Sequence, residues 1–159
     1  MTERWILVDG YSVLHAWPKL RRAAGRSLEQ QRDALVRVLR RFADARPARV
    51  TVVFDGYAAK RRPERNEPTP GVEVLYSESG KTADDVIERL VGLAEDRSRF
   101  LVVTSDNMER RTVESLGAQS MNGELFETEV TAALGELAAL VGEHSRRRRL
   151  GSVRHHFEG

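Results

Sequence analysis

Within 159 residues, of which 40% are hydrophobic, the chain has room for one α/β domain with a core of its own but not for two. It contains no cysteine, which excludes a disulfide framework and a thiolate zinc site and is typical of a reducing cytoplasm. Only a short apolar run precedes Asp9, and no other run approaches the length of a membrane span. We therefore expect a soluble cytoplasmic protein with neither a signal peptide nor a membrane contact.

Arginine dominates the basic residues. The formal net charge is only +2, yet the isoelectric point is about 9.3, and lysine accounts for only three of the 26 basic residues. A genomic compositional bias explains this excess as well as function does, so local clusters are more informative. Guanidinium groups suit phosphate because they offer paired hydrogen bonds. We predict polyanion contacts at two clusters, namely Lys60, Arg61 and Arg62 in a proline-bearing segment and Arg146, Arg147, Arg148 and Arg149 near the end.

Apolar runs and amphipathic stretches alternate along the chain. Residues 5–8 predict a strand, and residues 28–45, with Leu35, Leu39 and Phe42 at helical spacing, predict an amphipathic helix. The remaining predicted elements are, in chain order, a strand at 50–54, an irregular loop at 56–71, a strand at 72–76, a helix from Thr82, a strand at 100–103, a short helix at 107–116, a short strand near 118–121 and a helix with an apolar stripe over 126–141.

This alternation predicts a fold class. Strands that alternate with helices form a mostly parallel sheet with right-handed crossovers and helices on both faces. We therefore predict a three-layer α/β fold. We assign one domain to residues 1–143 and a basic tail to residues 144–159, and we expect the tail to be a solvated, flexible arm.

Acidic residues follow the apolar runs or open a helix at four places. Asp9 follows the first predicted strand, Asp55 the second and Asp106 the fourth, whereas Asp84 and Asp85 lie where a helix begins. The carboxyl ends of parallel strands line one edge of the sheet, so these side chains converge there. If the first and fourth strands are neighbours, Asp9 and Asp106 flank the crevice and Asp55 lies one strand away.

Each acid also has a structural explanation. Asp106 precedes a helix and suits an N-cap, Asp85 completes a capping box with Thr82, and Asp84 suits the positive end of the same helix. Asp9 and Asp55 each precede glycine and suit turns. Taken singly, these explanations are sufficient. Taken together, the placement of all the acids at one edge favours a functional cluster.

Electrostatic repulsion within such a cluster favours a bound metal ion. Two carboxylates about 4 Å apart repel each other by about 4 kcal/mol at an effective dielectric constant near 20. Several of them would therefore offset much of a domain's stability of about 5–15 kcal/mol unless a proton or a cation intervenes. Oxygen ligands select Mg²⁺ or Mn²⁺ over zinc. The chemistry that follows is metal-assisted hydrolysis of a phosphodiester bond.

At this point the motifs resemble a known family, the YacP-like branch of the NYN domain proteins, which are PIN-like nucleases. The segments that carry the resemblance are VDGYSVL at 8–14, VVFDG at 52–56, GKTADDVIERLV at 80–91, VVTSDNMERRTVESLGA at 102–118 and ELFETEV at 124–130. The resemblance covers nearly all of residues 5–141. It implies a PIN-like α/β fold, an acidic site for a divalent metal ion and endoribonuclease activity, with some members similar to ribosome-associated factors that cut messenger RNA.

The resemblance also assigns roles to residues. It implies that Asp9, Asp84 and Asp106 bind Mg²⁺ or Mn²⁺, with Asp55 matching the acid that closes the second strand. Asp85 is either a further ligand or a capping partner. Ser12, where the family usually has asparagine, is expected to position water or phosphate together with Thr104 and Ser105. The two basic clusters are then expected to bind RNA.

Other functions remain as alternatives. The main one is an RNA-binding or ribosome-binding module that keeps the fold but has weak or no catalysis, and Ser12 and the basic tail favour it. A phosphatase of the haloacid dehalogenase type needs a second acid where Tyr11 stands. A phospho-accepting receiver domain needs paired acids where the chain has Val8 and Asp9.

Overall fold

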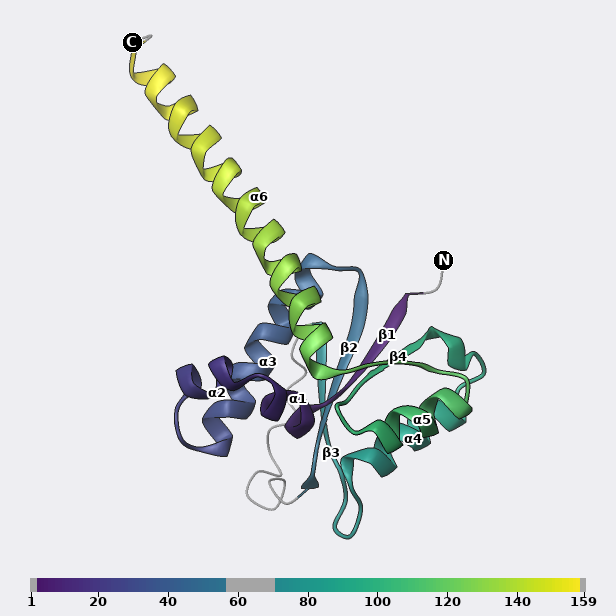
Figure 1. Cartoon of the computed structure of the whole chain (residues 1–159). Helices are drawn as coiled ribbons and strands as arrows, with labels where there is room; N and C mark the ends of the chain where they lie inside the picture. The colour runs from purple at the N-terminus through teal and green to yellow at the C-terminus, as the bar shows by residue number, and fades with distance from the viewer. Residues whose placement is uncertain (1–2, 57–70, 158–159) are drawn as a thin grey trace.

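The computed structural model describes residues 3–56 and 71–157 (Figure 1). Its centre is a parallel sheet with the strand order β3-β2-β1-β4-β5. The predicted strands and the predicted parallel sheet are confirmed, with boundaries that shift by one or two residues. The strands are β1 (Arg4–Asp9), β2 (Ala48–Phe54), β3 (Val72–Tyr76), β4 (Phe100–Val103) and β5 (Gln119–Met121).

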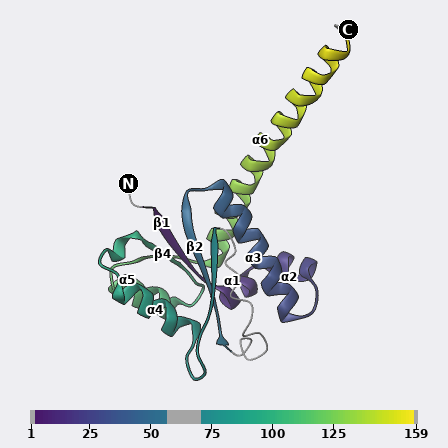
Figure 2. The same cartoon turned by 180° about the vertical axis from the view of Figure 1, so that it is seen from behind.

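Helices cover both faces of the sheet, as Figures 1 and 2 show from opposite sides. They are α1 (Gly10–Ala16), α2 (Pro18–Ala24), α3 (Leu28–Ala45), α4 (Ala83–Leu93), the 3-10 turn Arg97–Arg99, α5 (Asn107–Ser115) and α6 (Gly123–Phe157). The predictions lacked α1 and α2, because each has only seven residues and shows too few turns for a periodic pattern. No helix in the described ranges is both long and apolar enough to cross a membrane.

The strand at the centre of the sheet is buried on both faces. Ile6 and Val8 of β1 contribute to the core beneath α1, α3 and α6. Leu7, which points the opposite way, contributes to the core beneath α4 and α5. All three side chains are fully buried. This burial on both faces explains why the parallel strands are continuous apolar runs in the sequence.

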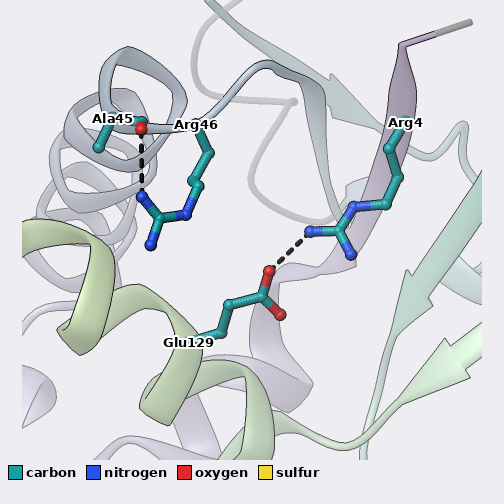
Figure 3. Close-up of polar contacts among 4 residues, drawn as sticks. All are labelled: Arg4, Ala45, Arg46 and Glu129. Atoms are coloured by element: carbon teal, nitrogen blue, oxygen red, sulfur yellow. Dashed lines mark hydrogen bonds and ion pairs between the residues drawn. The ribbon is translucent and has the colours of Figure 1, made fainter. Parts of the chain in front are cut away.

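The start of α6 is tied to the domain by polar contacts. Trp17 Nε1 donates a hydrogen bond of 2.8 Å to the carbonyl oxygen of Gly123. Figure 3 shows a guanidinium nitrogen of Arg4 in β1 paired with Glu129 of α6 at 2.6 Å. In the same view Arg46, which follows α3, donates to the carbonyl oxygen of Ala45 at 3.3 Å. The contacts of Trp17 and Arg4 fix the first turns of α6 relative to the end of α1 and to β1. An ion pair of 2.9 Å between Arg46 and Glu136 connects α6 to the end of α3.

The basic tail differs from its prediction. α6 continues without a break to Phe157, so the expected flexible arm is instead helical, and Figures 1 and 2 show it extending away from the sheet. The apolar stripe ends first, since Leu140 and Val141 are exposed. Long, straight side chains such as arginine lose little rotamer freedom in a helix and so favour this conformation in the exposed part of α6. The cluster Lys60, Arg61 and Arg62 lies outside the described residues.

Phe126 provides a test of the α6 docking. It is fully buried, and its ring lies 5.9 Å from that of Trp17 and 5.5 Å from that of Phe42. We expect Phe126→Ala to lower the free energy of unfolding by about 3–5 kcal/mol, because it leaves a cavity. The adjacent Leu125 is 56% exposed, so Leu125→Ala should change it by about 0.5 kcal/mol or less. Urea denaturation measures both, and equal losses would contradict this packing.

Candidate active site

The strand order brings three acidic strand ends together. β1 lies between β2 and β4 and is parallel to both. Asp9 is the last residue of β1, Asp55 follows β2 directly, and Asp106 follows β4 after a two-residue turn. The condition stated above, that the first and fourth strands are neighbours, is therefore met. Asp9 lies at the switch point of the sheet, with Asp106 on one side and Asp55 on the other.

Asp9 connects the ends of β1 and β4. Its Oδ1 accepts a hydrogen bond from the backbone amide of Ser12 at 3.4 Å, which caps α1. Its Oδ2 accepts from the hydroxyl of Thr104 at 3.3 Å. Burial, followed by the negative charge of Asp84, raises the pKa of Asp9 to about 6, although the bonds from Ser12 and Thr104 oppose the shift. Asp9 therefore exchanges a proton near neutral pH.

Three hydroxyl groups fix the turn between β4 and α5. The Ser12 oxygen accepts from the backbone amide of Ser105 at 2.7 Å, and the Thr104 oxygen accepts from that of Asp106 at 3.2 Å. The Ser105 oxygen accepts from the backbone amide of Gly123 at 3.2 Å. These predicted water-positioning or phosphate-positioning residues thus all contact protein groups. What they position in this structure is the turn that carries Asp106.

In Asp106 and in Asp55, one of the two carboxylate oxygens accepts hydrogen bonds from backbone amides. Oδ1 of Asp106 accepts from the backbone amides of Met108 at 2.9 Å and Glu109 at 3.3 Å, as the N-cap of α5. Oδ1 of Asp55 accepts from the backbone amide of Ala83 at 2.8 Å, at the start of α4. Within the described residues, neither Oδ2 makes a hydrogen bond. Both carboxylates are exposed, so each has an oxygen available for a ligand.

The adjacent acids Asp84 and Asp85 differ in their surroundings. Asp85 closes the capping box of α4, since its Oδ2 accepts from the backbone amide of Thr82 at 2.9 Å. That bond lowers the pKa of Asp85, which is fully exposed. Asp84 is half-buried, and burial followed by the charges of Asp106 and Glu88 raises its pKa. Asp84 therefore belongs to the acidic cluster, whereas Asp85 acts as the capping partner.

Two glutamates that the sequence analysis missed extend the cluster. Glu109 of α5 is only 4% exposed, and burial, a hydrogen bond with Glu88 and the charge of Asp84 raise its pKa to about 9. Its Oε1 is buried and has no hydrogen-bond partner in the described part of the chain. A signal was present, because Glu88 follows Asp84 by four residues and Glu109 follows Asp106 by three, spacings that share a helix face.

The cluster has the chemistry of a site for a hard divalent cation. Its donors are carboxylate and hydroxyl oxygens, which favour Mg²⁺ or Mn²⁺. Burial, together with repulsion from neighbouring acidic groups, raises the pKa values of Asp9, Asp84 and Glu109. In the side-chain positions described, no three acidic or histidine groups lie close enough to share one ion. Rotation of side chains such as Asp106, which caps its helix, would have to complete the ligand set.

Comparison with known proteins identifies the family of the chain. The family model of the YacP-like NYN domain matches residues 6–155. The uncharacterized protein YacP of Bacillus subtilis (strain 168) is 34% identical over 114 residues, which make up 71% of this chain and 66% of that protein. The match thus spans slightly less than two thirds of that relative.

Solved structures share the fold. The crystal structure of Rae1 (YacP) from Bacillus subtilis is 28% identical, with a TM-score of 0.79 over 96% of this chain and 87% of that one. The crystal structure of a tryptophan-to-leucine mutant of Rae1 matches with a TM-score of 0.74 over 89% of this chain and 82% of that one. The three-layer α/β fold is therefore PIN-like. The chain belongs to the YacP-like NYN domain family, which indicates a nuclease-type function related to RNA.

Proposed function

We propose that this protein is a metal-dependent endoribonuclease. The observation that carries the proposal is the convergence of Asp9, Asp84 and Asp106 at one edge of a parallel sheet, with burial and mutual repulsion raising the pKa values of Asp9 and Asp84. Membership of the YacP-like NYN domain family also supports a nuclease function for this site. A cluster that holds uncompensated negative charge in a half-buried position is typical of a functional site.

Asp9, Asp84 and Asp106 would hold Mg²⁺ or Mn²⁺. When bound, such an ion lowers the pKa of water and neutralises charge on the phosphate. Binding competes with a proton, because a carboxylate must be ionised to be a ligand and Asp9 has a pKa of about 6. Hydrolysis of this type leaves a 5′-phosphate and a 3′-hydroxyl.

The surrounding residues position these carboxylates. Asp55 accepts from Ala83 at 2.8 Å and so fixes the start of α4, which carries Asp84. Ser12 and Thr104 hold the turn before Asp106. The raised pKa of Glu109 keeps its carboxyl group protonated at neutral pH, which limits the charge beside Asp84.

We propose single-stranded RNA as the substrate, including messenger RNA on the ribosome. Arg146 and Arg148 on α6 are exposed and support this proposal. Their positive charge would attract RNA phosphates, whereas the acidic cluster repels them. A second candidate is a module that binds RNA or the ribosome without cutting it. The absence of three closely grouped ligands among the described side chains favours this candidate.

Replacement of Asp9 tests the catalytic proposal. We expect Asp9→Asn to slow RNA cleavage by roughly a thousandfold, because a cation's stabilisation of several kcal/mol is lost. Cleavage of a labelled RNA in Mn²⁺ measures the rate, and the exposed Asp33 of α3 provides a matched control in Asp33→Asn. Binding of RNA without cleavage by the wild type would favour the binding module. A fully active Asp9→Asn variant would remove the central ligand from the proposal.

The buried carboxyl group of Glu109 predicts a pH dependence of stability. Its pKa is raised from an ordinary value near 4.5 to about 9, so its contribution to stability is complete below 4.5 and is lost as the pH rises through 9. We expect Glu109→Gln to raise the free energy of unfolding at pH 8 by about 1–2 kcal/mol, after allowance for solvent screening. Without divalent cations, the free energy of unfolding of Glu109→Gln should also vary less between pH 5 and 9 than that of the wild type.

Chemical denaturation across this pH range measures the effect. The exposed Glu95 gives a control, because Glu95→Gln removes the same charge outside the cluster. Parallel pH curves for the wild type and Glu109→Gln would show that the Glu109 carboxyl group does not titrate as described.

A further inference from the structure

An open hollow lies beside α2 and is lined by none of the residues of the acidic cluster. It has a volume of about 680 Å³ and is lined by α2, the turn after it and the start of α3, through Pro18, Arg21, Arg22, Gly25, Arg26 and Gln31. The turn is possible because Gly25 has a φ of 121°, which other residues rarely adopt. The site described above uses none of these residues.

Among the described residues, those that line the hollow carry positive charge and no negative charge. Three of the six described lining residues are arginines, and none is an aspartate or glutamate. Arg22 and Arg26 are exposed and, within the described residues, they form no ion pair. Such guanidinium groups retain their full donor capacity for an anionic ligand.

Arg21 is the inner member of this group. It is half-buried, its Nη2 donates a long hydrogen bond of 3.4 Å to the carbonyl oxygen of His15, and its Nε is buried without a partner in the described ranges. Since buried polar groups are almost always paired, its donors are only partly used. A phosphate offers acceptors in the geometry that a guanidinium group matches.

The fold connects the hollow directly to the catalytic edge. Asp9 caps α1, and α2 follows α1 after a single residue, Trp17. Arg32, in the second turn of α3, donates a hydrogen bond of 3.1 Å to the hydroxyl of Tyr11 in α1. Figures 1 and 2 show α2 and the start of α3 beside α1, which begins where β1 ends. A chain of phosphates that leaves the acidic cluster along α1 would therefore reach the hollow.

We propose that this hollow binds a backbone phosphate of the RNA substrate at a distance from the scissile bond. This inference rests on the proposed nuclease function and adds a subsite to it. The subsite would position the RNA by charge and guanidinium geometry without reading its sequence. It would also offset the repulsion between phosphates and the acidic cluster.

The double variant Arg22→Gln and Arg26→Gln tests the proposal, because glutamine removes the charge and, at Arg22 in α2, keeps the helix propensity. The measurement is the dissociation constant of a short fluorescein-labelled single-stranded RNA over a series of salt concentrations in EDTA, where no cleavage interferes. We expect about tenfold weaker binding. The slope of log affinity against log salt should fall by roughly 0.7 for each lost phosphate contact. Arg22→Lys with Arg26→Lys should keep that slope.

The matched control is Arg40→Gln with Arg41→Gln, which removes two exposed charges from α3 outside the hollow. Circular dichroism and the melting temperature confirm that each variant folds. Equal RNA affinity and salt dependence in the hollow variant and the control would overturn the proposal. It would also be overturned if adenosine monophosphate bound the wild type but not the hollow variant while RNA affinity stayed unchanged, because the hollow would then hold a free nucleotide.

Failure of this subsite and failure of the nuclease proposal are distinguishable. RNA binding in EDTA does not depend on the acidic cluster holding a cation, whereas the Asp9→Asn assay measures cleavage alone. If Asp9→Asn loses cleavage as expected but the hollow variant binds RNA as tightly as the wild type, only the subsite is rejected.

Discussion

The parallel pairing of β1 with both β2 and β4 places carboxyl groups from separate stretches of the chain within electrostatic range of one another. Asp9, Asp84 and Glu109 all have raised pKa values, and burial is the first cause in each case. Because folding forces these groups together, the domain gives up stability at this edge. A cation that binds only the folded state would restore it.

The same acids serve the local structure and the site. Asp106 caps α5, Asp9 caps α1, and Asp55 accepts from the first residue of α4. A structural role therefore does not argue against a functional one. Each cap uses backbone amides to fix where a carboxylate sits, and such amides also favour its ionised form. Asp85 is different, because it closes the capping box of α4 and is fully exposed.

Much of the fold and part of the site could be predicted from the sequence. The apolar runs predicted the parallel strands, and the acids after them predicted the edge at which Asp9, Asp55 and Asp106 meet. The helices α1 and α2 escaped prediction because they are too short to show a period. Glu109 escaped it because an acid on an amphipathic helix normally faces solvent, whereas in this fold Glu109 is buried.

The arginine content was harder to interpret. Total composition could not separate phosphate recognition from a general excess of arginine, and the clusters chosen by sequence spacing lie on the far part of α6 or outside the described residues. Arg21, Arg22 and Arg26 were not singled out, because they gather only when α2 ends at Gly25 and the chain turns into α3. The turn between α2 and α3 brings these three arginines together.

The proposed function requires that Asp9, Asp84 and Asp106 bind one divalent cation together. Anomalous diffraction from crystals soaked with Mn²⁺ tests it most directly, because it locates the ion and its ligands in one measurement. We predict an ion coordinated by carboxylate oxygens of all three residues, with Asp106 rotated from its capping position. An acidic cluster without Mn²⁺ at a concentration that supports cleavage, or an ion held elsewhere, would contradict the account.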